Sequence, residues 1–407
     1  MRRSAWYALV LLTILGTSAS AQKKVKEPKR PTLGADADTN DAGGYYRWGV
    51  AQLEWYPEDA ADAFYWAIRL DPTSADAYYA RWAALHLSDP NRLVLYYLDR
   101  NEKIIRSAEV RQIDSLRLHA MQMNPYLYRK FERIMRQHAL QRWVEQNNPG
   151  VDQAELADDI REYTSKGGPY TKGINAYIAG NFPFALEEYA TAMPGWKYKF
   201  YLHAERGRIF YMLGAYDSAA AEFNRAVGEL RNYDKDELTF VYESKALYEQ
   251  SLAMIDEKRG RVDSARESYG RALQEDLSYA PAHLGLSAID LAKSDTAGAL
   301  SEMEIAAQVQ PNDGVIAYIY GRTLLLSAHD AQAVEQLKRA VVLEPYFAEP
   351  RILLAAVYDN ADYTAEAIEA YTAFLNLASK RDTRLALAQK RLVVLSAAAA
   401  APAPTKP

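Results

Sequence analysis

The sequence repeats its small residues and prolines at intervals of 34. One series of alanines runs Ala265, Ala299, Ala333 and Ala367, and a second runs Ala272, Ala306 and Ala340. Pro311 and Pro345 are also 34 residues apart. An earlier register pairs Gly173 with Gly207, Gly180 with Gly214, Ala185 with Ala219, and Ala192 with Ala226. A fixed period of this length predicts stacked copies of one small structural unit.

The repeated unit is predicted to be a pair of helices. Apolar residues recur at helical spacing along most of the chain, and no segment alternates convincingly like a β-strand. The stretch "GRIFYMLGAYDSAAAEFNRAV", from Gly207 to Val227, resembles a tetratricopeptide repeat, a helix-turn-helix of 34 residues. Small side chains allow two antiparallel helices to approach closely, and a proline ends the second helix. The resemblance implies an all-α fold, an α-solenoid that winds as a right-handed superhelix of such repeats.

The resemblance covers most of the chain and suggests its organisation. Repeats are expected at 44–72, 75–100, 166–196, 199–231, 240–278, 280–311, 314–345 and 348–379. The predicted regions are a signal peptide 1–21, a disordered leader 22–43, N-terminal TPR-like repeats 44–100, an irregular basic helical segment 101–165, a TPR array 166–379, a capping helix 380–396 and a disordered tail 397–407. The leader and the tail are assigned on their charge, proline and small-residue content.

The N-terminus predicts export of a bacterial type. The basic "MRR" precedes the apolar stretch "SAWYALVLLTILG", and Ala19-Ser20-Ala21 forms a small-residue cleavage site before Gln22. This order is typical of a cleaved secretory signal peptide, and the alternative is an uncleaved membrane anchor. We therefore expect a periplasmic or secreted protein, cleaved after Ala21, with no integral membrane span in the mature chain.

The charge is unevenly distributed along the chain. The net charge is −5 for the whole chain, but residues 91–144 contain 11 Lys and Arg against 5 Asp and Glu. That segment carries +6, and the remainder carries −11. One interpretation is a set of degenerate repeats with a solvated basic face. The other is a docking surface for an acidic partner or for anionic lipid head groups. A nucleic-acid partner is not expected for an exported, acidic protein.

Motifs for chemistry are missing from the sequence. It contains no cysteine, which excludes disulfides, thiolate nucleophiles and zinc ribbons. The six histidines show no metal-binding spacing, and no nucleophile elbow or phosphate-binding glycine loop occurs. We therefore predict no catalytic residues, no metal site and no cofactor, and we interpret the chain as a non-enzymatic protein.

The resemblance also implies which residues face the inner, concave surface. Counting from the small residue of each first helix selects a ligand groove of Tyr170, Tyr177, Tyr201, Arg208, Tyr318 and Arg322. Tyrosine and arginine are enriched in binding hot spots. The lysine and asparagine pattern of the carboxylate-clamp subfamily is absent, so recognition of a C-terminal carboxylate is not expected. The alternative is that the tyrosines pack between neighbouring repeats.

These observations favour a periplasmic TPR scaffold that binds protein or peptide partners through its concave groove, in assembly of the cell envelope. An alternative is a regulatory or accessory subunit of a polysaccharide synthesis or export system, or of another envelope enzyme. A third is a purely structural spacer.

Overall fold

The fold is entirely helical in the part of the chain that the structure describes. The computed structural model describes residues 27–99, 101–147, 150, 152, 155, 158, 167–230 and 244–400 of the 407-residue chain. These residues form α-helices and one short 3₁₀ helix, and no strand occurs among them. The prediction of an all-α solenoid is confirmed. Neither the predicted signal peptide nor residues 401–407 of the predicted tail lie within the described residues.

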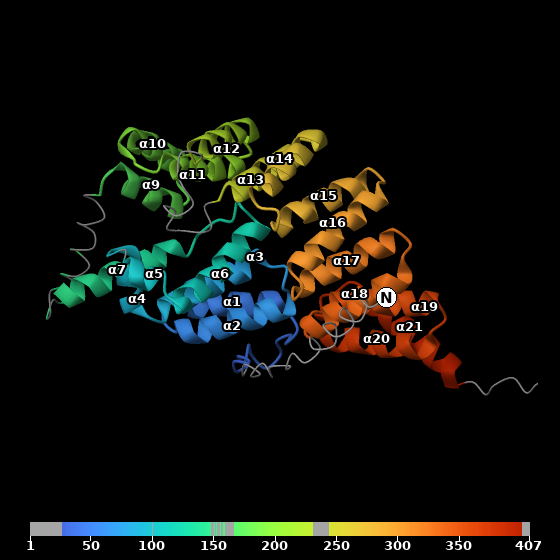
Figure 1. Cartoon of the computed structure of the whole chain (residues 1–407). Helices are drawn as coiled ribbons and strands as arrows, with labels where there is room; N and C mark the ends of the chain where they lie inside the picture. The colour runs from blue at the N-terminus through green and yellow to red at the C-terminus, as the bar shows by residue number, and fades with distance from the viewer. Residues whose placement is uncertain are drawn as a thin grey trace, which may run out of the picture.

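The C-terminal part is a row of helix hairpins, here called the array (Figure 1). Its helices are α9 (Pro169–Ile178), α10 (Phe182–Ala192), η1 (Met193–Gly195), α11 (Lys199–Met212), α12 (Tyr216–Leu230), α13 (Lys245–Lys258), α14 (Val262–Glu275), α15 (Ala280–Ala292), α16 (Thr296–Val309), α17 (Gly314–Leu326), α18 (Asp330–Leu343), α19 (Glu349–Asn360), α20 (Thr364–Leu377) and α21 (Leu385–Ala400). From α9 to α20, each hairpin packs against the next, and α21 covers α20.

Small residues set the close approach within each hairpin. A methyl group at Gly207 of α11 would lie 2.8 Å from the ring of Phe223 on α12. The equivalent Gly173 and Gly321 would clash in the same way with Tyr189 and Leu337 of their own second helices. The alanines of the 34-residue series, such as Ala219 and Ala333, are fully buried. The repeated small residues are therefore the contact points between the two helices of each hairpin.

The N-terminal part, here called the N unit, spans residues 42–147. It contains α1 (Ala42–Gln52), α2 (Pro57–Leu70), α3 (Ala75–Leu87), α4 (Pro90–Tyr97), α5 (Glu102–Ile105), α6 (Ala108–Met123) and α7 (Glu132–Asn147). Helices α1 and α2 form a hairpin of the same kind as those of the array. Helix α3 packs against both α2 and α6, while α4 packs mainly against α7. In the predicted second repeat, 75–100, α3 and α4 contact each other only slightly, because α6 lies against α3 and α7 lies against α4.

Residues 27–41 differ from the predicted disordered leader 22–43. The backbone oxygen of Pro28 accepts a hydrogen bond from Trp66 Nε1 at 3.2 Å. The Arg30 guanidinium lies 4.8 Å from the centre of the Trp66 ring. Helix α1 begins at Ala42, inside the predicted leader. The polar leader is held by aromatic side chains of α2, and composition alone does not show such tertiary contacts.

The array curves around the N unit and meets it again at its far end (Figure 1). Arg69 Nη1 of α2 lies 2.6 Å from Glu344 Oε2, directly after α18. Trp66 packs edge-on against Tyr346 with 5.1 Å between ring centres. Asp38 accepts a hydrogen bond of 2.8 Å from the Ser379 hydroxyl, after α20. The start of the described chain is therefore joined to the last repeats. Among the described residues, we find no helix with the length and apolar character needed to span a membrane.

Candidate protein-interaction surfaces on the concave face

One position of each repeat in the array is expected, from the resemblance, to face the concave side. It follows the small residue of each first helix, and we call it the concave row: Ile174, Arg208, Met254, Ala288, Arg322 and Ala356. Ile174 and Arg208 are 4% and 1% exposed, respectively. Met254 is half-buried, and the last three residues are exposed. The concave face is therefore covered along α9, α11 and α13 and open along α15, α17 and α19.

The covered part is occupied by residues 124–131, here called the cis segment, which joins α6 to α7. The Tyr126 ring stacks on Tyr211 of α11, with 3.5 Å between centres and 5° between planes. The Tyr126 hydroxyl donates to the backbone oxygen of Ser251 on α13. The Tyr128 hydroxyl donates to the oxygen of Ile178 at 2.8 Å, at the end of α9. Two aromatic residues of the cis segment thus contact three successive repeats.

Backbone atoms at and beside the cis segment are also recognised. Arg208 Nε donates to the oxygen of Pro125 at 3.2 Å. Gln250 Nε2 of α13 donates to the oxygen of Gln122 at 2.7 Å, two residues before the segment begins. The backbone N–H of Arg129 donates to the Tyr177 hydroxyl at 3.2 Å. These bonds fix the path of the segment along the array independently of its side chains.

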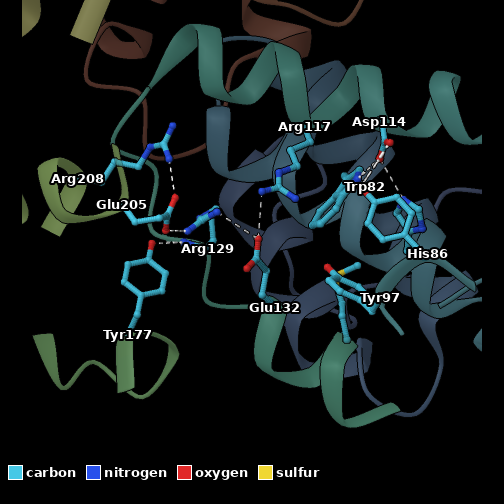
Figure 2. Close-up of polar contacts among 12 residues, drawn as sticks. Trp82, His86, Tyr97, Asp114, Arg117, Arg129, Glu132, Tyr177, Glu205 and Arg208 are labelled. Carbon is cyan, nitrogen blue, oxygen red and sulfur yellow. Dashed lines mark hydrogen bonds and ion pairs between the residues drawn. The ribbon is translucent and has the colours of Figure 1, made fainter. Parts of the chain in front are cut away.

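Alternating charges link the N unit to the array in the buried interior (Figure 2). The ion pairs follow one another in the order Arg117–Glu132–Arg129–Glu205–Arg208. The nitrogen–oxygen distance is 3.2 Å between Arg117 and Glu132 and 2.6 Å between Arg208 and Glu205. All five residues are at most 5% exposed. Ionised side chains at this depth are stable only because each has an opposite neighbour.

The pKa values in this chain of charges follow from those neighbours. Burial raises the pKa of Glu132, but Arg129 and Arg117 outweigh it, so the pKa lies below its ordinary value. Burial lowers the pKa of Arg129, but Glu132 and Glu205 outweigh it, and the pKa lies well above its ordinary value. Both groups are therefore held in their charged forms.

Two arginines of the predicted basic surface are thus inside the protein. Arg117 and Arg129 belong to the basic segment 91–144, and their acidic partners are Glu132 and Glu205 of the same chain. Other cations of the segment, such as Arg111 and Arg133, are exposed. An external acidic partner at these exposed residues remains a prediction.

The structure divides the six predicted groove residues among three places. Tyr177 and Arg208 are both 1% exposed and contact the cis segment. Tyr170 stacks on Trp196 with 4.0 Å between ring centres, and half-buried Tyr201 lies beside it. Tyr318 packs edge-on against Phe347, and Arg322 is exposed one turn further along α17. Binding of an external ligand at these residues stays a prediction. In this structure the two most buried ones hold the chain's own segment.

A cleft that was not predicted from the sequence lies where the N unit faces α17. It encloses about 570 Å³, and its lining includes Tyr78, His119, Gln122, Asp313, Val315 and Glu344. Burial lowers the pKa of His119, and Asp313 opposes this effect. One sequence signal for the covered groove exists, the aromatic stretch "NPYLYRKF" at 124–131. The cleft has no such signal, because its two walls lie far apart in the sequence.

The described part of the chain lacks a candidate metal site. No cluster of three or more His, Asp or Glu side chains there is arranged to hold a metal ion.

Comparison with known proteins returns helical-repeat structures. No protein-family model matches the sequence, and no curated protein matches it significantly. The C-terminal part of a TPR repeat-containing protein from Cytophaga hutchinsonii is 15% identical, covers 57% of this chain and 89% of its own, and has a TM-score of 0.47. YrrB, described as a TPR protein with an unusual peptide-binding site, is 16% identical, with coverage of 51% and 100% and a TM-score of 0.39. TTC0263, a thermophilic TPR protein in Thermus thermophilus, is 23% identical, with coverage of 49% and 99% and a TM-score of 0.33.

The assignment of the fold rests on the chain's own repeats. Each hairpin from α9 to α20 joins a first helix with a small residue to a second helix with buried alanines, and the 34-residue spacing links equivalent positions. The chain is an all-α solenoid of helix hairpins with a 34-residue repeat, an arrangement similar to that of the tetratricopeptide-repeat structures named above.

Proposed function

We propose that the protein is an exported scaffold that binds partner proteins through the open part of its concave face, in assembly of the cell envelope. The observation that carries this proposal is the change of exposure along the concave row. Arg208 contacts a polypeptide segment, whereas its counterpart Arg322, in the same position of a later repeat, is exposed. A surface that holds one segment in its first repeats has the geometry to hold another in its last.

In the open part, helix α17 carries side chains that suit contact with a partner protein. Val315, Tyr318 and Arg322 follow one another along a single helix face, at spacings of three and four residues. Val315 lines the cleft of about 570 Å³. The half-buried Tyr318 provides an aromatic surface, and Arg322 provides directional hydrogen-bond donors. Tyrosine and arginine together form the core of many protein-binding surfaces.

Partner capture from envelope extract tests this function. The full-length chain and its Arg322→Ala variant would be used as bait, with Arg339→Ala as a control. Arg339 is an exposed arginine on α18, the second helix of the same repeat. We expect Arg322→Ala to lower capture several-fold while Arg339→Ala leaves it unchanged. Equal capture by all three proteins would exclude the open concave face. Enrichment of polysaccharide synthase subunits would instead favour the accessory-subunit function.

Export is supported by the basic, apolar and small-residue order of the first 21 residues. N-terminal sequencing of the protein from a periplasmic extract should give Gln22 as the first residue. Recovery of an intact Met1 from the cytosol would contradict export.

A further inference from the structure

We propose that the covered part of the concave face, along α9, α11 and α13, is a peptide groove for a defined sequence chemistry. Its partner is a short segment with two aromatic residues separated by one residue and followed by arginine, with a turn at its start like that closed by the Leu127 N–H and the Asn124 oxygen in the cis segment. Residues Tyr126-Leu127-Tyr128-Arg129 of the cis segment have this order and occupy the groove in the closed molecule. The inference rests on the scaffold function proposed above and names a partner chemistry for the same concave face.

The cis segment divides its side chains between the two sides of the interface. Tyr126 packs in a cluster with Phe223 and Tyr248 of the array. Leu127 and Phe131 instead belong to the core cluster of the N unit. Tyr128 also faces the array, and Arg129 lies between Glu205 of the array and Glu132 of the N unit.

The groove offers three distinct subsites to the segment. The ring of Tyr211 gives a flat stacking surface for Tyr126, the first aromatic residue. Phe223 packs edge-on against the Tyr126 ring, with 5.8 Å between ring centres. The carbonyl oxygens at the end of α9 accept the hydroxyl of Tyr128, the second aromatic residue. The carboxylate of Glu205 pairs with Arg129. Taken in order along the cis segment, these subsites select aromatic, any residue, aromatic, arginine.

Groove side chains also bind the backbone of the segment. Arg208 donates to the oxygen of Pro125, and the Tyr177 hydroxyl accepts from the N–H of Arg129. Main-chain contacts of this kind hold the backbone whatever its side chains are, while the subsites select the side chains.

Covalent connection gives the cis segment an advantage over any external peptide. A tethered ligand acts at an effective concentration in the millimolar range. An external segment of ordinary affinity will therefore bind only when the cis segment has lost its anchors. The wild-type chain is expected to be a poor binder, and a chain with a weakened cis segment a good one.

The test measures binding of a fluorescent peptide with the sequence of residues 124–131, NPYLYRKF, by anisotropy. The proteins are the full-length wild type and the double variant Tyr126→Ala/Arg129→Ala, whose cis segment lacks two anchors. A peptide in which the arginine at the position of Arg129 is replaced by glutamate serves as the matched control. We expect the double variant to bind NPYLYRKF at least tenfold more tightly than the wild type does. We expect the same variant to bind the glutamate peptide at least tenfold less tightly than it binds NPYLYRKF.

Two results would overturn the inference. The first is a folded double variant, judged by helical circular dichroism, that does not bind the peptide or binds both peptides equally. The second is loss of helical signal both in this variant and in the milder Tyr126→Leu/Arg129→Lys, because the segment would then belong to the folding core. If the peptide does not bind while Arg322→Ala still lowers capture of envelope partners, only this inference is wrong. If the peptide binds while Arg322→Ala has no effect, only the proposed open surface falls.

Discussion

At the scale of single residues, one backbone position separates the early repeats from the late ones. The second residue after the first helix of each hairpin in the array has a positive φ, between 58° and 77°. It is glycine in the early repeats, at Gly180, Gly214 and Gly260, but Ser294, Ala328 and Asp362 in the later ones. The turn after it is closed in the same way in both groups. Ala215 N–H donates to the oxygen of Phe210 at 2.9 Å, and His329 N–H donates to that of Leu324 at 2.9 Å. Such a helix end favours glycine.

Replacing Ala328 by glycine is therefore predicted to stabilise the protein. The left-handed conformation costs a residue with a Cβ atom about 1 kcal/mol, and Ala328 is exposed, so little packing is lost. The reverse change, Gly214→Ala, should cost a similar amount. Urea denaturation of both variants measures the two effects, and a lower stability for Ala328→Gly would contradict this account of the turn.

The two arginines of the concave row should respond differently to removal. Arg208→Ala removes one of the cations that pair with Glu205 in the buried interior, and breaking a buried pair costs about 3–5 kcal/mol. Arg322→Ala removes an exposed side chain and should change the free energy of unfolding by less than about 0.5 kcal/mol. Thermal denaturation compares them directly. Equal effects of the two substitutions would show that burial does not distinguish these positions.

At the scale of the helix hairpin, the seam between the two helices limits the size of side chains. Gly207→Ala would place a methyl group 2.8 Å from the Phe223 ring, and overpacking of this kind costs about 1–3 kcal/mol. Gly228 on α12 is a matched control, because a methyl group there meets no atom within 4 Å. Gly228→Ala should stabilise the helix by up to about 1 kcal/mol. Chemical denaturation of the two variants should give shifts of opposite sign.

At the scale of the whole molecule, the N unit and the array are joined at two ends. Near the start of the array, the contacts are the buried charges and the cis segment. Near its end, they are partly exposed contacts such as Arg69 with Glu344. The two junctions should therefore differ in their response to acid and to charge reversal.

The buried junction is predicted to weaken in acid. The pKa of Glu132 lies below its ordinary value of 4.5 in the folded protein. A lowered carboxyl pKa stabilises the fold above the ordinary value, and this contribution is lost as the pH falls through the folded-state pKa. The free energy of unfolding should therefore decrease as the pH falls below about 5.

A Glu132→Gln variant should show a shallower decrease in equilibrium denaturation over the same range. Glu187→Gln, which changes an exposed glutamate on α10, should keep the wild-type slope. A slope that is unchanged in Glu132→Gln would mean that this carboxylate does not couple stability to pH.

The far junction is predicted to open on charge reversal. Arg69→Glu would place two carboxylates opposite each other where the side chains of Arg69 and Glu344 are 19% and 21% exposed. Partly exposed pairs contribute about 1 kcal/mol or less, so the expected change is a larger radius of gyration in small-angle X-ray scattering rather than unfolding. Lys293→Glu, which breaks an exposed pair with Asp263 inside the array, should leave the radius unchanged.

The sequence by itself determined the fold class and the array, because each hairpin is specified by residues close together in the chain. Gly207 and Phe223 lie only 16 residues apart, so their complementary sizes recur as a visible 34-residue pattern. The same pattern indicated the concave positions, including Arg208 and Arg322.

Only the tertiary structure decided which of these positions are open. Arg208 is buried because the cis segment lies against it, with Pro125 accepting its hydrogen bond. Arg322 is exposed because the cis segment does not extend to α17. Ordering of residues 27–41 and the partnership of α3 with α6 likewise depend on contacts between elements that are not adjacent in the chain. Such contacts leave no periodic trace in a sequence, since each is made once, between residues whose separation has no fixed value.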